Sequence, residues 1–263
     1  MRRASDKLDP DKIQAGLKTN RIGKRVLVYE STTSTNDIAS EYAKNRKNDG
    51  LVILAEQQTA GRGRAGLKWI TGKADSILCS IILTEVTFSS DLLSLVSAVA
   101  VAKTLTKTTG RSAQIKWPND ILLDGKKAAG ILLESKQYKI SIFYILGIGI
   151  NCHQKTKDFP HEIRRIATSI DLETTSTCNR ILLIQELLSS LEQCLKTAAS
   201  DSRKIIDQWQ QHSILYHHRI KLVYNGQKFE GHCMGIDPQK GLILKLDFGG
   251  TRFFDAAHTS IIK

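Results

Sequence analysis

The 263-residue sequence lacks long hydrophobic runs, paired cysteines and an apolar leader. Its most apolar stretch, residues 140–150, is shorter than the ~20 residues of a membrane-spanning helix. The five cysteines are scattered, odd in number and without a CxxC pair, which excludes a disulfide framework and a typical zinc site. Residues 1–12 carry charge but no apolar segment, unlike a signal peptide. We therefore expect a soluble protein in a reducing, cytoplasmic setting.

Proline, with 4 residues, and aromatic side chains, at 6%, are also scarce, whereas 41% of the residues are apolar and 24% are charged. This composition is typical of a globular protein and excludes the collagen-like and disordered classes. At this length we expect one large domain, or a large and a small one, with a substantial core.

Charge is the unusual property, because 38 basic and 26 acidic residues give a net charge of +12. Eight basic residues stand against three acidic ones in residues 1–25, and seven against four from His217 onward, so the excess is spread along the chain. No run of five or six like charges marks a basic tail. A diffuse positive charge suits polyanionic or acidic partners, nucleotides included, and a basic nucleic-acid-binding protein stays open as an alternative.

Hydrophobic periodicity and turn residues predict an α+β protein. The predicted strands cover residues 24–30, 52–54, 76–86, 115–117, 121–123, 128–134 and 140–150. One helix is predicted to begin at the Ser34 region, and three further helices are predicted over residues 91–109, 179–197 and 202–216. After His217 the apolar pattern changes to period two, with an Asn225-Gly226 turn, which predicts a small module of about five strands packed on the preceding helices.

Two segments combine glycine or a rigid turn with cationic side chains. In GRGRAGLKW, residues 61–69, the glycines let backbone N–H groups approach a ligand, and Arg62, Arg64 and Lys68 suit phosphate or carboxylate. A solvated basic loop or an RNA contact of the RGG kind are the alternatives. In KWPND, residues 116–120, the proline holds the chain extended and places Asn119 and Asp120 at a strand end.

Three other segments each allow two structural interpretations when taken alone. Lys127 precedes the small residues 128–130, which leave room for a ligand, although a hairpin with a solvated lysine pair has the same pattern. In GIGIN, Gly147 and Gly149 fall on one strand face and open a slot, or else admit a closely packed helix. STTSTND, residues 31–37, is typical of a helix cap.

The fixed order of Ser34-Thr35-Asn36, GRGRAG with Trp69, KWPND, Lys127 to Gly130, GIGIN and a small β module resembles the biotin protein ligase (holocarboxylase synthetase) family, in its form without an N-terminal helix-turn-helix domain. The resemblance extends from Val26 to the end of the chain. GRGR and KWPND together are specific, because lipoate ligases on the same fold lack that pair.

The resemblance implies an α+β fold: a class II synthetase-like catalytic domain, with helices packed on a mixed sheet, and a small SH3-like β-barrel. It divides the chain into a connector-like segment 1–25, a catalytic domain 26–216 and a C-terminal domain 217–263.

The sequence departs from the family pattern at two places. Leu67 occupies a loop position where bifunctional members can carry arginine, and about 25 residues are too few for the winged helix-turn-helix of ligase-repressors, so repression by that route is not expected.

The implied activity uses ATP and Mg²⁺ to convert biotin into biotinyl-5′-AMP and pyrophosphate. The biotinyl group then passes to a lysine of a biotin carboxyl carrier protein, such as that of acetyl-CoA carboxylase. A monomer or a homodimer is expected, without DNA binding or membrane attachment. Lipoate or octanoate ligation on the same fold and a nucleic-acid-binding protein with a dead ligase domain are the alternatives.

The resemblance also implies three overlapping sets of site residues and no fixed protein ligand for the metal. The biotin-binding set comprises Ser34, Thr35, Asn36, Gln58, Gly61, Arg62, Arg64, Lys127, Gly130, Gly149 and Asn151. The ATP- and adenylate-binding set comprises Arg62, Arg64, Trp69, Asn119, Lys127 and Asn151. The catalytic set comprises Lys127, Arg64, Asp120 and Arg62.

The resemblance also implies the role of each residue, and the chemistry of the substrates agrees with these roles. A ureido ring has one carbonyl acceptor and two N–H donors, so the Ser-Thr-Asn turn and Gln58 are implied to bind it. Arg62 and Arg64 belong to the loop that closes over the adenylate, and Lys127 is implied to lie near the biotin carboxylate and the α-phosphate.

Three further roles concern the adenine ring, the amine of the acceptor lysine and the thiol of Cys152. Trp69 is implied to stack near the adenine. Asp120 is our candidate for orienting or deprotonating the acceptor amine. Because no nucleophilic side chain is needed, we expect Cys152 to be a packing residue.

Overall fold

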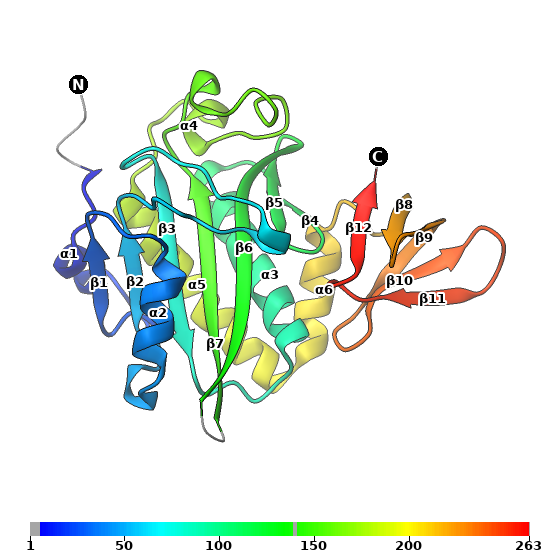
Figure 1. Cartoon of the computed structure of the whole chain (residues 1–263), viewed down its shortest axis with the longest axis horizontal. Coiled ribbons are helices and arrows are strands. Elements are labelled where there is room, and N and C mark those ends of the chain that lie inside the picture. The colour runs from blue at the N-terminus through cyan, green and yellow to red at the C-terminus, as the bar shows by residue number, and fades with distance from the viewer. Residues whose placement is uncertain (1–5, 139–140, 263) are drawn as a thin grey trace.

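A mixed β-sheet forms the centre of the protein in this computed structural model, which describes residues 6–138 and 141–262 (Figure 1). Within these residues, its seven strands have the order β1-β2-β3-β7-β6-β5-β4. The strands are β1 (Val26–Tyr29), β2 (Val52–Ala55), β3 (Ser76–Leu83), β4 (Gln114–Lys116), β5 (Asp120–Leu123), β6 (Lys126–Tyr138) and β7 (Ser141–Asn151). Strands β1 and β2 are parallel and the other neighbours are antiparallel.

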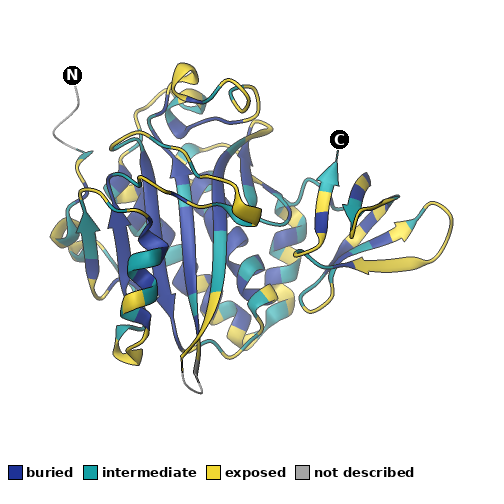
Figure 2. Ribbon diagram, in the orientation of Figure 1, coloured by how far each residue is buried: buried dark blue, intermediate teal, exposed yellow. Residues whose placement is uncertain are grey.

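Helices cover both faces of this sheet. The helices α3 (Ser90–Thr109), α5 (Arg180–Ser200) and α6 (Ser202–His212) pack together behind it, and α2 (Thr35–Ala43) lies on its front (Figure 1). Alternation along β3 explains the two layers, since Ile77 and Ile81 join the core of the three-helix side and Ile82 joins the core beneath α2. Figure 2 shows the central strands in dark blue, as expected for a sheet buried on both faces.

The C-terminal residues form a second, antiparallel sheet of order β11-β10-β9-β8-β12. Its strands are β8 (Arg219–Tyr224), β9 (Gln227–Asp237), β10 (Gly241–Leu246), β11 (Thr251–Phe254) and β12 (Thr259–Ile262). Asn225 and Gly226 both have positive φ, as the two-residue turn between β8 and β9 requires. Leu222 and Phe254 join Trp209 of α6 in the main core. The prediction of an α+β fold with a small β module on the preceding helices is confirmed.

The N-terminal segment contains a helix that periodicity did not predict, α1 (Pro10–Ala15). Ile13 and Ile22 are fully buried in the main core. The carboxylate of Glu192 accepts hydrogen bonds at 2.8–2.9 Å from the backbone N–H groups of Asn20, Arg21 and Ile22. Burial raises the pKa of Glu192, but bonds from Lys196 and these N–H groups outweigh it and lower the pKa to about 2. The domain boundaries that we placed at residues 25/26 and 216/217 stay predictions.

Several element ends differ from the predicted ones. Strand β3 ends at Leu83 rather than residue 86, β6 continues to Tyr138, and α6 ends at His212, after which Ser213 adopts extended backbone. Residue 140, the predicted start of β7, lies outside the described residues. The short helix α4 (Ile170–Glu173) and the 3₁₀ turns η2 (Arg46–Asn48), η3 (Arg64–Gly66) and η4 (Thr156–Asp158) were not predicted. None of the described helices is long and apolar enough to span a membrane.

Candidate active site

A cavity of about 650 Å³ lies on the α2 side of the central sheet, within the usual size range of small-ligand pockets. The predicted site residues that line it are Ser34, Thr35, Asn36, Gln58, Arg62, Arg64, Trp69, Asn119, Asp120, Lys127, Gly130, Gly149 and Asn151. Gly61 is not a lining residue; its carbonyl accepts a hydrogen bond from the N–H of Trp69. The fold thus brings together residues of all five segments that the sequence analysis singled out.

Strand register places small residues side by side on the floor of the cavity. Gly149 of β7 is paired with Gly130 of β6, and Gly147 is paired with Ser80 of β3. A Cβ atom on Gly147 would lie 2.6 Å from Oδ1 of Asn36, and one on Gly149 would lie 2.5 Å from the indole of Trp69. The glycines do open a slot on one face, and the side chains of Asn36 and Trp69 enter it. The buried Nε1 of Trp69 has no hydrogen-bond partner among the described residues.

One end of the cavity is a network of short polar side chains. Ser34 caps α2, and Ser34, Thr35 and Asn36 are buried. Oε1 of Gln58 accepts hydrogen bonds from the backbone N–H and the hydroxyl of Thr35 at 2.7 and 2.9 Å. Oγ of Ser80 lies 2.7 Å from Oγ1 of Thr35 and 2.5 Å from Oδ1 of Asn36. Motif reasoning missed Ser80, although a serine amid the apolar residues of β3 is itself a signal.

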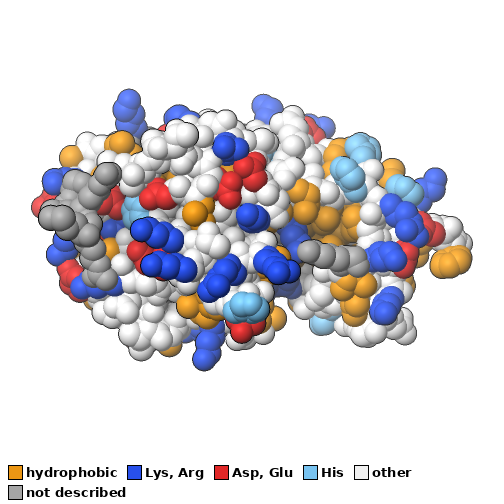
Figure 3. Space-filling model, turned by 90° about the horizontal axis from the view of Figure 1, so that it is seen from above, with side chains coloured by type: hydrophobic (Ala, Val, Ile, Leu, Met, Phe, Trp, Pro, Cys, Tyr) orange, Lys and Arg blue, Asp and Glu red, His pale blue; other side chains and the backbone are white. Residues whose placement is uncertain are grey.

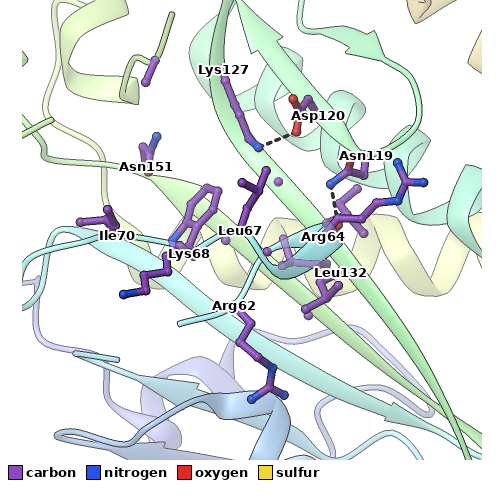
Figure 4. Close-up of a pocket in the computed structure, with 18 of the residues that line it drawn as sticks. Arg62, Arg64, Leu67, Lys68, Ile70, Asn119, Asp120, Lys127, Leu132 and Asn151 are labelled. Carbon is purple, nitrogen blue, oxygen red and sulfur yellow. Dashed lines mark hydrogen bonds and ion pairs between the residues drawn. The ribbon is translucent and has the colours of Figure 1, made fainter. Parts of the chain in front are cut away.

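Arg62 lies at this polar end of the cavity. Its guanidinium pairs with Asp37 at 2.6 Å and with Glu134 at 3.5 Å, and the side-chain amide of Asn36 donates to the same Glu134 oxygen at 2.8 Å. The hydrogen bond with Asp37 raises the pKa of Arg62. In Figure 4, Arg62 points away from Lys127 and Asp120. Glu134 was missed, although alternation from Gly130 places it on the cavity face.

The other end of the cavity is charged. The ammonium of Lys127 lies 2.5 Å from Oδ1 of Asp120 and 5.7 Å from the ring centre of Trp69 (Figure 4). A β-bulge explains how Lys127 reaches the cavity. Leu122 pairs with Lys127 but Ile121 pairs with residue 129, so Ala128 is the extra residue. The bulge brings Lys127 to the same face as Gly130, which strict alternation would not do.

Arg64 extends toward this charged end, near Asn119 in Figure 4. Burial lowers the pKa of its guanidinium, and the nearby carboxylates of Asp120 and Asp255 partly offset that effect. Asn119 is fixed by two hydrogen bonds to Ile131, because its backbone carbonyl accepts from the Ile131 N–H and its side-chain amide donates to the Ile131 carbonyl. These two hydrogen bonds hold the Asn119 amide on the side of the cavity where Lys127 and Asp120 lie.

The segment of residues 159–167 forms a wall that motif reasoning missed. The backbone of Lys127 bonds to this segment and its neighbour, donating to Ile166 O and accepting from the Thr168 N–H. Ile163 and Ile166 are exposed and line the cavity, as do the exposed Leu67 of the GRGRAGLKW segment and Ile70, which follows that segment. The segment has no regular periodicity that could have identified it.

In the described residues, no three His, Cys, Asp or Glu side chains cluster as a metal site.

Next to the cavity, His153 lies between two carboxylates. Its Nε2 is 2.6 Å from Asp6 and its Nδ1 is 2.8 Å from Asp171. The hydrogen bond with Asp6 is the main reason that the pKa of His153 rises to about 9; burial opposes it, and Asp171 adds to it.

This raised pKa predicts a pH-dependent stability. Because the pKa is about 6.5 in the unfolded chain, the stabilisation is complete below that pH and is lost as the pH rises through about 9. It amounts to up to about 3 kcal/mol in the free energy of unfolding. Urea unfolding of the wild type and of His153→Gln, at about pH 6 and pH 10, measures it. If the two proteins differ in free energy of unfolding by the same amount at both pH values, the raised pKa of His153 is contradicted.

Comparison with known proteins decides the family. The model of the Biotin/lipoate A/B protein ligase family matches residues 28–151. The chain is 32% identical over 256 residues to the bifunctional ligase/repressor BirA of Bacillus subtilis, over 95% of this chain and 78% of that protein. The chain belongs to the biotin protein ligase family. A biotin–acetyl-CoA-carboxylase ligase of Mycobacterium tuberculosis is 31% identical over 93% of each chain.

Solved structures agree with this membership at the level of the fold. The biotin protein ligase from Aquifex aeolicus in complex with biotin and ATP superposes with a TM-score of 0.79 at 24% identity, over 91% of this chain and 99% of that one. The membership of the biotin protein ligase family that the motifs suggested is therefore confirmed, and the chain is a ligase of this family.

Proposed function

We propose that this biotin protein ligase joins biotin to ATP as biotinyl-5′-AMP and then transfers the biotinyl group to a lysine of a biotin carboxyl carrier domain. One observation carries the proposal: a single cavity has a network of short hydrogen-bonding side chains at one end, Thr35, Asn36 and Gln58, and the charged pair of Lys127 and Asp120 at the other. Biotin has the same polarity, with a ureido ring at one end and a carboxylate at the other.

In the first step, a carboxylate oxygen of biotin attacks the α-phosphorus of ATP, and the bond to pyrophosphate breaks. Both reactants are anions, so cationic groups must offset the charge that gathers between them. We assign that role to Lys127 and Arg64, which lie at the charged end; Arg62, paired with Asp37 and Glu134, lies at the polar end. Mg²⁺ bound to the ATP phosphates would supply further positive charge there, as is usual for a cation that keeps several waters.

Trp69 and Asn151 border the space between the two ends. Asn151 donates a hydrogen bond from its side-chain amide to the carbonyl of Thr168, which ties β7 to the wall segment. The unpartnered Nε1 of Trp69 is a donor for a bound ligand. The exposed apolar side chains of Leu67 and Ile163 can shield the mixed anhydride from water once the rim closes.

In the second step, the amine of the acceptor lysine attacks the acyl carbon, the bond to AMP breaks, and the amine loses a proton. The carboxylate of Asp120 accepts that proton. It is bound to Lys127 in this structure, and it becomes available when Lys127 turns toward the phosphate.

The acceptor and the setting remain proposals as well. Proteins similar to this chain are named for acetyl-CoA carboxylase, which supports a carrier domain as the partner. Lys and Arg side chains lie along the whole length of the face in Figure 3, as suits an acidic partner better than a single nucleic-acid groove. A monomer or homodimer without DNA binding, in the cytoplasm, stays a prediction.

Exchange of pyrophosphate into ATP tests the first step. We expect the wild-type protein to catalyse ATP–pyrophosphate exchange that depends on biotin and not on lipoate or octanoate. Exchange driven by lipoate would overturn the proposed substrate in favour of lipoate ligation. Salt-sensitive retention on DNA without any exchange would favour the nucleic-acid-binding alternative.

A further inference from the structure

A partly buried charge cluster joins the N-terminal segment to three strand ends beside the cavity. Its members are Asp6, Glu56, His153, Asp171 and Arg180. The side chain of Arg180 is 1% exposed and that of Glu56 is 3% exposed. None of these residues lines the cavity, so the two-step mechanism does not use them directly.

Arg180, at the start of α5, is the centre of the cluster. Its guanidinium donates to the carboxylate of Asp6, to the carboxylate of Glu56 and to the carbonyl of Ser76, at 2.8, 2.8 and 3.2 Å. It also donates to the backbone carbonyl of Asp6 at 2.7 Å. A cation this deeply buried needs both carboxylates, because an unpaired buried charge is strongly destabilising.

Asp6 is the member that the N-terminal segment supplies. One carboxylate oxygen accepts from the backbone N–H of Arg180, and the other is shared by Nε of Arg180 and Nε2 of His153. The segment is also attached two residues later, where the N–H of Leu8 donates to Glu56. Asp6 therefore bridges α5 and the residues that follow β7.

The strand ends held by the cluster lead directly to cavity residues. Glu56 follows β2, and two residues later Gln58 bonds to Thr35 at the polar end. Ser76 begins β3, pairs with Asn151 and accepts a hydrogen bond at 2.6 Å from Gln154, which also donates to Asn151 at 3.3 Å.

We propose that Asp6 is a positioning residue of the ligase: by pairing with Arg180 and His153, it holds the ends of β2, β3 and β7 so that Gln58 and Asn151 keep their places in the cavity. The inference rests on the proposed function, because the affected quantity is the binding of biotin. A residue that acts only on the preorganisation of the pocket changes KM more than kcat.

Asp6→Asn tests this role, because it removes the charge and retains the size of the side chain. In biotin-dependent pyrophosphate exchange we expect KM for biotin to rise about 2- to 30-fold, with kcat within about twofold of the wild type. Asp6→Glu, which retains the charge, is expected to restore part of the lost affinity, and His153→Gln to raise KM by less than Asp6→Asn. Asp11→Asn, an equal charge change at an exposed position of the same segment, should match the wild type.

Three outcomes separate this proposal from the proposed function. An active wild type together with the same KM in Asp6→Asn and Asp11→Asn would overturn the positioning role alone. If Asp6→Asn does not fold, a wild-type KM in His153→Gln overturns it. If the wild type shows no exchange, the proposed activation step is wrong, and dissociation constants for biotin from calorimetry decide the positioning role, since equal values in Asp6→Asn and Asp11→Asn overturn it.

Discussion

Lys127→Ala is expected to lower biotin-dependent ATP–pyrophosphate exchange by about 10²- to 10³-fold, because it removes a fixed cation from the place where the carboxylate and α-phosphate charges meet. The bulge at Ala128 directs the Lys127 side chain onto the cavity face, and its backbone is bonded to the wall at Ile166. The backbone of Lys127 is therefore held in position before the substrates bind, and only its side chain has to turn from Asp120 toward the phosphate. Exchange rates at saturating biotin and ATP measure its contribution.

The neighbouring Lys126 supplies the matched control for this experiment. It is exposed on the same strand, so Lys126→Ala removes an equal charge at the next position. We expect this variant to exchange pyrophosphate at the wild-type rate. Equal rates in both variants would show that Lys127 does not act on the reacting groups.

Asp120→Asn is expected to spare adenylate formation and to slow transfer to the carrier domain by about 10²- to 10⁴-fold, the usual contribution of a general base. Asparagine retains the size of the side chain but cannot accept the proton of the acceptor amine. The measurement is a single-turnover transfer from enzyme-bound biotinyl-AMP to a carrier domain, set beside pyrophosphate exchange by the same variant.

The exposed Asp124 provides the control for Asp120. It lies in the β5–β6 turn with a positive φ that asparagine tolerates, so Asp124→Asn changes charge without straining the turn. We expect wild-type transfer from it. If Asp120→Asn instead lowers exchange and transfer equally, the carboxylate acts by holding Lys127 and not as a base.

Local signals in the sequence account for much of the fold. The apolar run of β3, the capping serine of α2 and the Asn225-Gly226 turn each specify their own element, because burial, capping and positive φ are properties of short segments. The helix α1 was missed because six residues are too few for a helical period to emerge.

Most of the motif residues do line the cavity, but the wall of residues 159–167 and the side-chain pairings were not predictable from the motifs. Alternation from Gly130 would have put Lys127 on the opposite face, and only the bulge, a property of strand register, reverses that. Arg62 pairs with Asp37 and Glu134, which are 25 and 72 residues away, so no local pattern reveals its partners. The contact between Asp6 and Arg180 spans 174 residues.

Biotinylation of a carrier domain tests the central claim most directly. The purified protein is incubated with ATP, Mg²⁺, biotin and a biotin carboxyl carrier domain, and the mass of the carrier is measured. We expect the carrier to gain one biotinyl group on one lysine, only when ATP and biotin are both present, and a carrier with that lysine replaced by arginine to gain none. An unchanged carrier mass in the complete mixture would contradict the assignment of this cavity to biotin transfer.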